Sequence, residues 1–209
     1  ISVEINSVGD RDSMTKFSRE LSSYYRKNIN SMSPECRQLF KKDPFELLSS
    51  HNPSSRELNT GAPRSMSFLS ETSRRHLEEV LEYLEALNIS YTVNNGLIGN
   101  RAYCTETIFT IVNTDNKDKN QHILGVGVRW SGLGKHLGMK KDISGIGMSL
   151  LIKNNKSALR KPLTKVKRPI AAFVQLGLES KLVSLVVIEN LRQVKIPLHV
   201  SLAKDRLGA

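Results

Sequence analysis

The chain has 209 residues, of which 39% are apolar and 24% charged, and its formal net charge is +11. This length suits one or two globular domains, and this composition excludes a fibrous or wholly disordered chain. No apolar run approaches the roughly 20 residues of a membrane span, and residues 1–5 lack a signal peptide's basic start. Cys36 and Cys104 have no metal-ligand spacing, so we expect neither a disulfide framework nor a zinc site, and a cytoplasmic location.

The first third of the chain predicts one strand followed by amphipathic helices. Apolar and polar residues alternate over 1–5, the period of a half-buried strand. From Met14 to Tyr25 apolar residues recur every three or four positions, which predicts a helix with one buried face. Ser33 before Pro34 predicts the start of a second helix. Clustered Ser, Asn, Pro and Gly predict an irregular excursion over 49–67.

The middle of the chain predicts a helix and then an antiparallel sheet. Ser70 caps a helix with a continuous leucine stripe, and Asn88 is its predicted stop. A period of two follows, with a turn at 94–96 and a polar hairpin tip at 114–121. Strands are predicted at 91–93, 97–103, 107–112 and 122–130, and a short helix at 145–152.

The C-terminal segment predicts a separate unit. Residues 153–169 hold seven Lys/Arg, two prolines and no acid, which indicates a linker. Beyond it, a strand at 170–176, a helix at 179–194 and a strand at 197–202 form a βαβ pattern with a parallel pair. This unit stops where another helix should begin, so we expect a chain truncated at both ends.

Positive charge gathers in residues 117–168, which hold 13 Lys/Arg and two acids. Their net charge of +11 equals that of the whole chain. Such asymmetry indicates a polyanionic partner or a basic linker, and a solvated face without a partner stays open as the alternative.

Common catalytic motifs are absent from the sequence. It contains no phosphate-binding glycine loop, nucleophile elbow, zinc-protease helix or dinucleotide fingerprint, and its five histidines are scattered. Two glycine-bearing segments remain as candidate sites. Alternation predicts that Gly99, Arg101, Tyr103 and Thr105 share a face, where they hold a small carboxylate or amine ligand or simply meet solvent.

The second segment carries glycines 125 and 127 inside a predicted strand. Such glycines indicate the close approach of a ligand or another backbone, or a bulge. Arg129 is then a rim charge or a ligand contact, and Trp130 a core aromatic or a pocket wall.

Several segments, in order along the chain, carry a resemblance to a known family. The segments are Ile5 to Gly9, Pro34 to Cys36, Asp43 to Ser49, Gly99 to Thr110, Gly125 to Leu133 and Ser201 to Leu207. They resemble motifs of the histidyl-tRNA synthetases, a class II family. In the family's two histidine-binding strands, the matching residues are Tyr103, Thr105, Thr107, Phe109, Gly127, Arg129, Gly132 and Leu133.

The resemblance implies an α+β fold, with a class II synthetase-like antiparallel sheet and a helical insertion, followed by the start of an α/β anticodon-binding domain. Residues 1–168 would form the C-terminal part of the catalytic domain. The implied parts are an insertion over roughly 8–68, the sheet with the motif 3 region over roughly 69–152, a basic linker at 153–168, and a truncated anticodon-binding domain at 169–209.

The chain departs from the family at the implied active site. Gly99 stands where the family has its catalytic Arg, and Cys104 where it has its second Tyr. Trp130 and Ser131 replace Tyr and Asp, and no Arg occupies the motif 3 position. Arg101 lies two residues from Gly99, on the same face of the predicted strand, so we expect its guanidinium to substitute for the lost Arg.

The implied function is that of a histidine–tRNA ligase, which activates histidine with ATP and Mg and transfers it to tRNA(His). Motifs 1 and 2 would precede Ile1, so the intact parent, a cytoplasmic homodimer, would be the enzyme and this segment alone inactive. Arg101 is the implied catalytic residue. The implied substrate-binding residues are Gly99, Tyr103, Cys104, Gly127, Arg129 and Trp130, and the implied tRNA-binding residues are Lys161, Lys165, Lys167 and Arg168.

Two alternatives stay open. The first is a synthetase-like paralogue that has lost ligase activity and serves as a binding or regulatory module, which the active-site departures favour. The second is a generic RNA-binding βαβ protein. It is disfavoured because aromatic residues make up only 6% of the chain and no strand shows paired exposed rings for base stacking.

Overall fold

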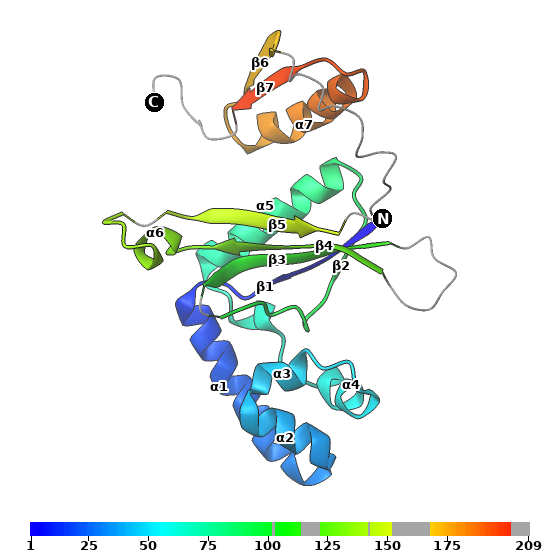
Figure 1. Ribbon diagram of the computed structural model, residues 1–209, viewed down its shortest axis with the longest axis vertical. Coiled ribbons are helices and arrows are strands. Elements are labelled where there is room, and N and C mark those ends of the chain that lie inside the picture. The colour runs from blue at the N-terminus through cyan, green and yellow to red at the C-terminus, as the bar shows by residue number, and fades with distance from the viewer. Residues whose placement is uncertain (102, 114–121, 142, 152–167, 202–209) are drawn as a thin grey trace. The chain divides into compact units, whose positions relative to one another are not determined.

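The computed structural model describes residues 1–101, 103–113, 122–141, 143–151 and 168–201 (Figure 1). They form a mixed α+β fold of two compact units. The first unit comprises Ile1–Glu79 and Tyr91–Leu151, and the second Val80–Ser90 and Ile152–Ala209. Among the described helices, none combines the length and hydropathy of a membrane-spanning segment.

A five-stranded sheet in the order β2-β1-β3-β4-β5 forms the centre of the first unit. The pairs β1–β3, β3–β4 and β4–β5 are antiparallel, and the β3–β4 pair confirms the antiparallel hairpin predicted around 114–121. The pair β1–β2 is parallel, with Val3 opposite Tyr91, so the antiparallel prediction is wrong there. The strands are β1 Ser2–Ser7, β2 Tyr91–Val93, β3 Cys104–Asn113, β4 His122–Trp130 and β5 Gly145–Leu150.

Two predicted elements have another structure. The strand predicted at 97–103 is wrong for the described residues 97–101 and 103, which form a loop because Ile98 is buried in the core of the helical region. The predicted turn before it is present, with Leu97 N donating to Asn94 O at 3.1 Å. The helix predicted at 145–152 is wrong, since Gly145–Leu150 is the edge strand β5 and pairs with β4.

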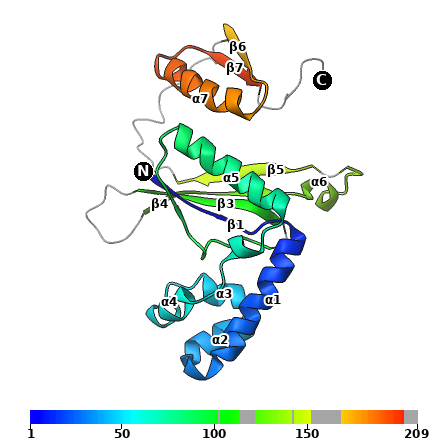
Figure 2. The ribbon, with the colours of Figure 1, turned by 180° about the vertical axis from the view of Figure 1, so that it is seen from behind.

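Helices α1 to α4 lie on one side of the sheet, and residues 71–79 of α5 lie on the other (Figures 1 and 2). The excursion predicted at 49–67 is wrong in part, because it contains α4 and a 3-10 turn. The helical elements are α1 Arg11–Lys27, η1 Ile29–Ser31, α2 Pro34–Lys42, α3 Pro44–Leu48, α4 Pro53–Thr60, η2 Ser65–Phe68, α5 Glu71–Ala86 and α6 Leu133–His136.

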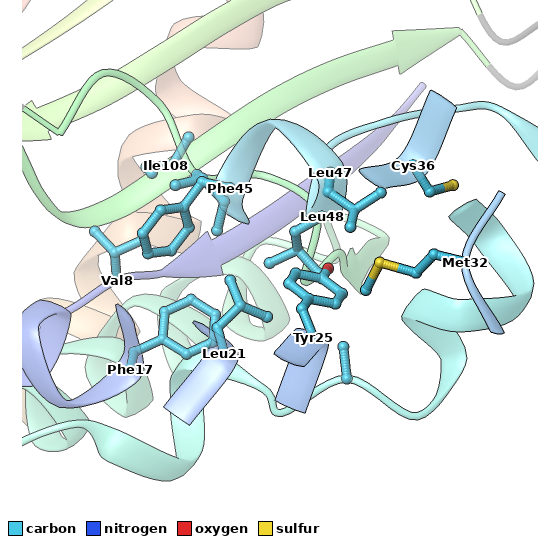
Figure 3. Packing of buried hydrophobic residues seen from close by; sticks show 12 residues of the cluster. Val8, Phe17, Leu21, Tyr25, Met32, Cys36, Phe45, Leu47, Leu48 and Ile108 are labelled. Carbon is cyan, nitrogen blue, oxygen red and sulfur yellow. The ribbon is translucent and has the colours of Figure 1, made fainter. Parts of the chain in front are cut away.

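The core of the helical region confirms the predicted face of α1. Phe17, Leu21 and Tyr25 are fully buried and pack against residues of α3 (Figure 3). The Phe17 and Phe45 rings meet edge to face at 5.5 Å between centroids, which adds to the burial of apolar area. The capping prediction is also confirmed, since the side chain of Ser33 accepts a hydrogen bond from Cys36 N at 3.2 Å.

The second unit contains the predicted βαβ arrangement, which is therefore confirmed. Strands β6 (Ala171–Val174) and β7 (Leu198–Ser201) are parallel, with Ala171 opposite Leu198. Helix α7 (Leu178–Gln193) connects them. The predicted hairpin tip at 114–121 and nearly all of the predicted linker lie outside the described residues.

Candidate functional site

The register of the sheet divides the predicted substrate-binding residues between its two faces. Cys104 lies opposite Trp130, and Trp130 opposite Gly145, on the face toward helices α1 to α4. Since side chains alternate along a strand, Gly127 and Arg129 lie on the opposite face. The structure therefore brings Cys104 and Trp130 together and separates Arg129 from them.

Trp130 lies against the edge strand β5. A Cβ atom on Gly145 would come within 2.5 Å of the indole Nε1, and one on Gly147 would overlap the six-membered ring. The two glycines thus leave the space that the indole fills. The indole N–H is buried and has no hydrogen-bond acceptor among the described residues.

Cys104 and Gly99 meet at the start of β3. The Cys104 side chain is 4% exposed, and burial raises the pKa of its thiol, so the thiol is protonated at neutral pH. Gly99 has φ +65°, a left-handed conformation that glycine adopts without strain. A Cβ atom there would lie 3.1 Å from both Cys104 Sγ and Ile108 Cδ1. A larger residue at position 99 therefore requires both the backbone and these neighbours to move.

Arg101, the predicted catalytic residue, binds to residues at the start of helix α3. Its guanidinium forms a hydrogen-bonded ion pair with the Asp43 carboxylate, and its Cζ lies 4.6 Å from the centroid of the Phe45 ring. Asp43 also caps α3, since its Oδ1 accepts from Phe45 N at 3.0 Å. Tyr103 follows in the same loop and is 42% exposed. Arg101 is thus held by the helical region and does not project from a strand beside Gly99.

Arg129 contacts α5. Its Nη1 lies 3.2 Å from Nε2 of His76, and its Nε is buried without an acceptor among the described residues. Burial lowers the pKa of His76, and the positive charge of Arg129 lowers it further, against the weaker opposite effect of Glu106 and Glu79. His76 is therefore neutral at pH 7 and accepts a hydrogen bond from the guanidinium.

A polar network that sequence reasoning missed lies beside this pair. Ser73 Oγ donates to Glu106 Oε1 at 2.9 Å, and Ser70 Oγ donates to Asp10 Oδ2 at 2.7 Å. Asp10 N in turn donates to Ser73 Oγ at 3.2 Å, which joins the two contacts. Glu106 adopts φ +57° where the register of β3 and β4 shifts. In the sequence, only the serines at the start of α5 indicated hydrogen bonding here, and they did not indicate their partners.

The loop 97–103 borders two clefts in the first unit. A cleft of about 550 Å³ lies between this loop and α3, and Asp43, Phe45, Gly99 and Arg101 line it. A second cleft of about 640 Å³ reaches from Gly99 across the sheet toward α4. Within the described residues, no three His, Cys, Asp or Glu side chains are grouped as a metal site would require.

Of the four predicted tRNA-binding residues, the structure describes one. Arg168 is described and exposed. Lys161, Lys165 and Lys167 lie outside the described residues, so their role stays a prediction.

The antiparallel-rich sheet and its glycine-bearing strands relate the chain to the class II aminoacyl-tRNA synthetases. In particular, the chain is homologous to the histidine–tRNA ligases. It is 28% identical to the histidine–tRNA ligase of Protochlamydia amoebophila over 211 residues, 100% of this chain and 49% of that protein. It is 32% identical to that of Pelotomaculum thermopropionicum over 160 residues, 77% of this chain and 37% of that protein.

The structural comparison agrees. The apo histidyl-tRNA synthetase of S. aureus matches 98% of this chain and 50% of its own chain, with a TM-score of 0.52 and 25% identity. No family model matches the chain. The chain thus spans about half the length of the curated relatives that it matches.

Proposed function

We propose that the chain is part of a histidine–tRNA ligase that activates histidine with ATP and transfers it to tRNA(His). One observation carries this proposal: the two segments similar to the family's histidine-binding strands, β3 and β4, are adjacent, and β5 follows as the third strand. Homology to histidine–tRNA ligases along the whole chain supports the same function.

The proposal assigns a role to each part of the chain. Residues 8–68 are the helical insertion of the catalytic domain, 69–152 its sheet and motif 3 region, 153–168 a basic linker, and 169–209 the beginning of the anticodon-binding domain. The working enzyme is a cytoplasmic homodimer of the intact parent. ATP with Mg is a substrate there, and the half of the relatives' length outside this chain supplies further ATP contacts.

The chemistry is electrostatic, because adenylate formation develops charge on phosphoryl and carboxylate groups and needs no covalent enzyme intermediate. Arg101 is the cation available near Gly99, and it must exchange the Asp43 carboxylate for a phosphate oxygen to act. Cys104 and Trp130 form one wall of the histidine pocket, with Gly99 and Tyr103 beside them. Gly127 and Arg129 support that wall from the far face of the sheet.

A specific observation favours a second function, that of a synthetase-like binding or regulatory module without ligase activity. Position 99 is a glycine, and Arg101, two residues further along the chain, is already paired with Asp43. The indole of Trp130 also fills the space above Gly145 and Gly147.

Pyrophosphate exchange into ATP by the intact parent protein separates the two functions. Exchange that requires histidine supports the ligase, since it needs a working adenylate site, and its absence supports the module. In an active parent, Arg101→Ala should lower the exchange rate by at least tenfold. An unchanged rate would reject the catalytic role of Arg101 while leaving the ligase function in place.

A further inference from the structure

The outward side of helix α1 and the side chain of Arg101 together form an open cleft of about 450 Å³. Three guanidinium groups and three hydroxyl groups line it, and no carboxylate of the described residues does. We name it the α1 arginine groove, and its lining residues are Met14, Thr15, Ser18, Arg19, Ser22, Arg26 and Arg101.

The groove is built on a regular helical repeat. Arg19 and Arg26 are seven residues apart, so they share a face of α1 and their Cα atoms lie about 10 Å apart along its axis. Between them, Ser22 Oγ donates to Ser18 O, and before them Thr15 Oγ1 donates to Arg11 O, both at 2.8 Å. The hydroxyl protons of Thr15 and Ser22 are thus already used, so the arginines supply most of the donors for a ligand.

Two of the three guanidinium groups are available. Arg26 forms no ion pair with any residue that the structure describes. Arg19 reaches Glu20 only at 3.9 Å, and its side chain is 80% exposed, so this contact holds it weakly. Arg101 is paired with Asp43, whose carboxylate offsets its charge, so the free positive charge of the groove comes from Arg19 and Arg26.

We propose that the α1 arginine groove binds phosphate groups of an RNA backbone. Guanidinium groups match phosphate oxygens with paired hydrogen bonds, and the lining that the structure describes contains no acid to repel an anion. The open form suits a strand that passes over the surface better than a small molecule, which needs an enclosed pocket. The choice of RNA rests on the proposed function, whereas the phosphate chemistry rests on the groove alone.

The test compares two double variants of the full chain that remove the same charge. Arg19→Ala with Arg26→Ala removes the groove's free cations. Lys16→Ala with Lys27→Ala removes two exposed cations of the same helix that do not line the groove. Binding of a fluorescent 20-nucleotide RNA is measured by anisotropy across a range of KCl concentrations, without histidine or ATP. Thermal unfolding checks that both variants keep the helix.

At low salt we expect the arginine variant to bind RNA at least tenfold more weakly than the unmodified chain. The slope of log K against log salt should fall in magnitude by about two, one for each phosphate group that an arginine no longer neutralises. The lysine variant should bind less than threefold more weakly. Equal weakening in the two variants would overturn the proposal, because it would reflect general charge and not a groove.

A second arm identifies the source of the phosphate. Titration with pyrophosphate should show binding much weaker than that of RNA. A different result would overturn the choice of RNA. If pyrophosphate bound more tightly than RNA, and the arginine substitutions weakened only pyrophosphate binding, the ligand of the groove would be a small phosphate compound. These binding measurements need no catalysis. If the parent showed no pyrophosphate exchange, the proposed ligase function would be rejected, but the proposal that the groove binds RNA would not be affected.

Discussion

The indole of Trp130 lies so close to Gly145 that a Cβ atom on this glycine would come within 2.5 Å of the indole nitrogen. The two residues lie opposite each other in β4 and β5. Strand β5 is therefore matched to the ring that covers it, and any larger side chain under the indole must displace either the ring or the strand.

This fit predicts that Gly147→Ala destabilises the first unit by about 1–3 kcal/mol, the usual effect of overpacking. The Cβ atom would overlap the indole ring of Trp130. Urea unfolding of the chain measures the destabilisation. Trp130→Leu supplies the matched control, because Gly147→Ala should cost much less in that background. An equal cost in both backgrounds would show that the indole is not the obstacle.

The Arg101–Asp43 ion pair predicts a modest coupling energy. Both side chains are partly exposed, so solvent screens the attraction and we expect about 0.5–1 kcal/mol from a double-mutant cycle of Arg101→Ala and Asp43→Asn. Asparagine keeps an oxygen that can accept from Phe45 N, so the cap of α3 is preserved. Additive effects of the two changes on urea unfolding would mean that the pair contributes nothing measurable.

His76 predicts a loss of stability at mildly acid pH. Its folded pKa lies below the ordinary value of 6.5, so the unfolded chain binds this proton first as the pH falls. The contribution of neutral His76 to the free energy of unfolding is fully present above about pH 6.5. It is lost as the pH falls below that value, by at most about 1.4 kcal/mol per pH unit.

His76→Gln removes this titration and offers an amide oxygen to Arg129. The unfolding free energy of the variant should therefore fall less between pH 7 and 5 than that of the unmodified chain. Parallel pH profiles for the two proteins would contradict the depressed pKa of His76.

Asp10 predicts a further loss of stability at lower pH. Burial alone would raise the pKa of its carboxyl, but hydrogen bonds from Ser13 N and Ser70 Oγ outweigh burial and hold the pKa below the ordinary 3.8. Its stabilisation is complete above that value and is lost as pH falls through the folded pKa.

Asp10→Ala should cost about 1–2 kcal/mol at pH 7, because it removes the cap of α1 and the acceptor of Ser70. Asp12→Ala, an exposed acid of the same first turn, is the control and should cost less than about 0.5 kcal/mol. Thermal unfolding at pH 7 and 3 compares the two variants, and equal costs would contradict a role for the Asp10 contacts.

Local patterns in the sequence determined much of the helical region and the C-terminal unit. The spacing of Phe17, Leu21 and Tyr25 is enough to predict both α1 and its buried face, since helical periodicity depends only on neighbouring residues. Strand, helix and strand follow with the same clarity in β6, α7 and β7. The resemblance to histidyl-tRNA synthetases, confirmed by the homology, also rested on short segments and their order.

Tertiary structure alone decided the pairings that build the site. Arg101 meets Asp43 across 58 residues, and Arg129 meets His76 across 53. Ile98 is buried among the helices, so the predicted strand beside Gly99 does not form. Likewise, β5 is a strand because it pairs with β4, and its glycines leave room for the indole of Trp130. Such contacts depend on the register of strands and the packing of distant helices, which no local period encodes.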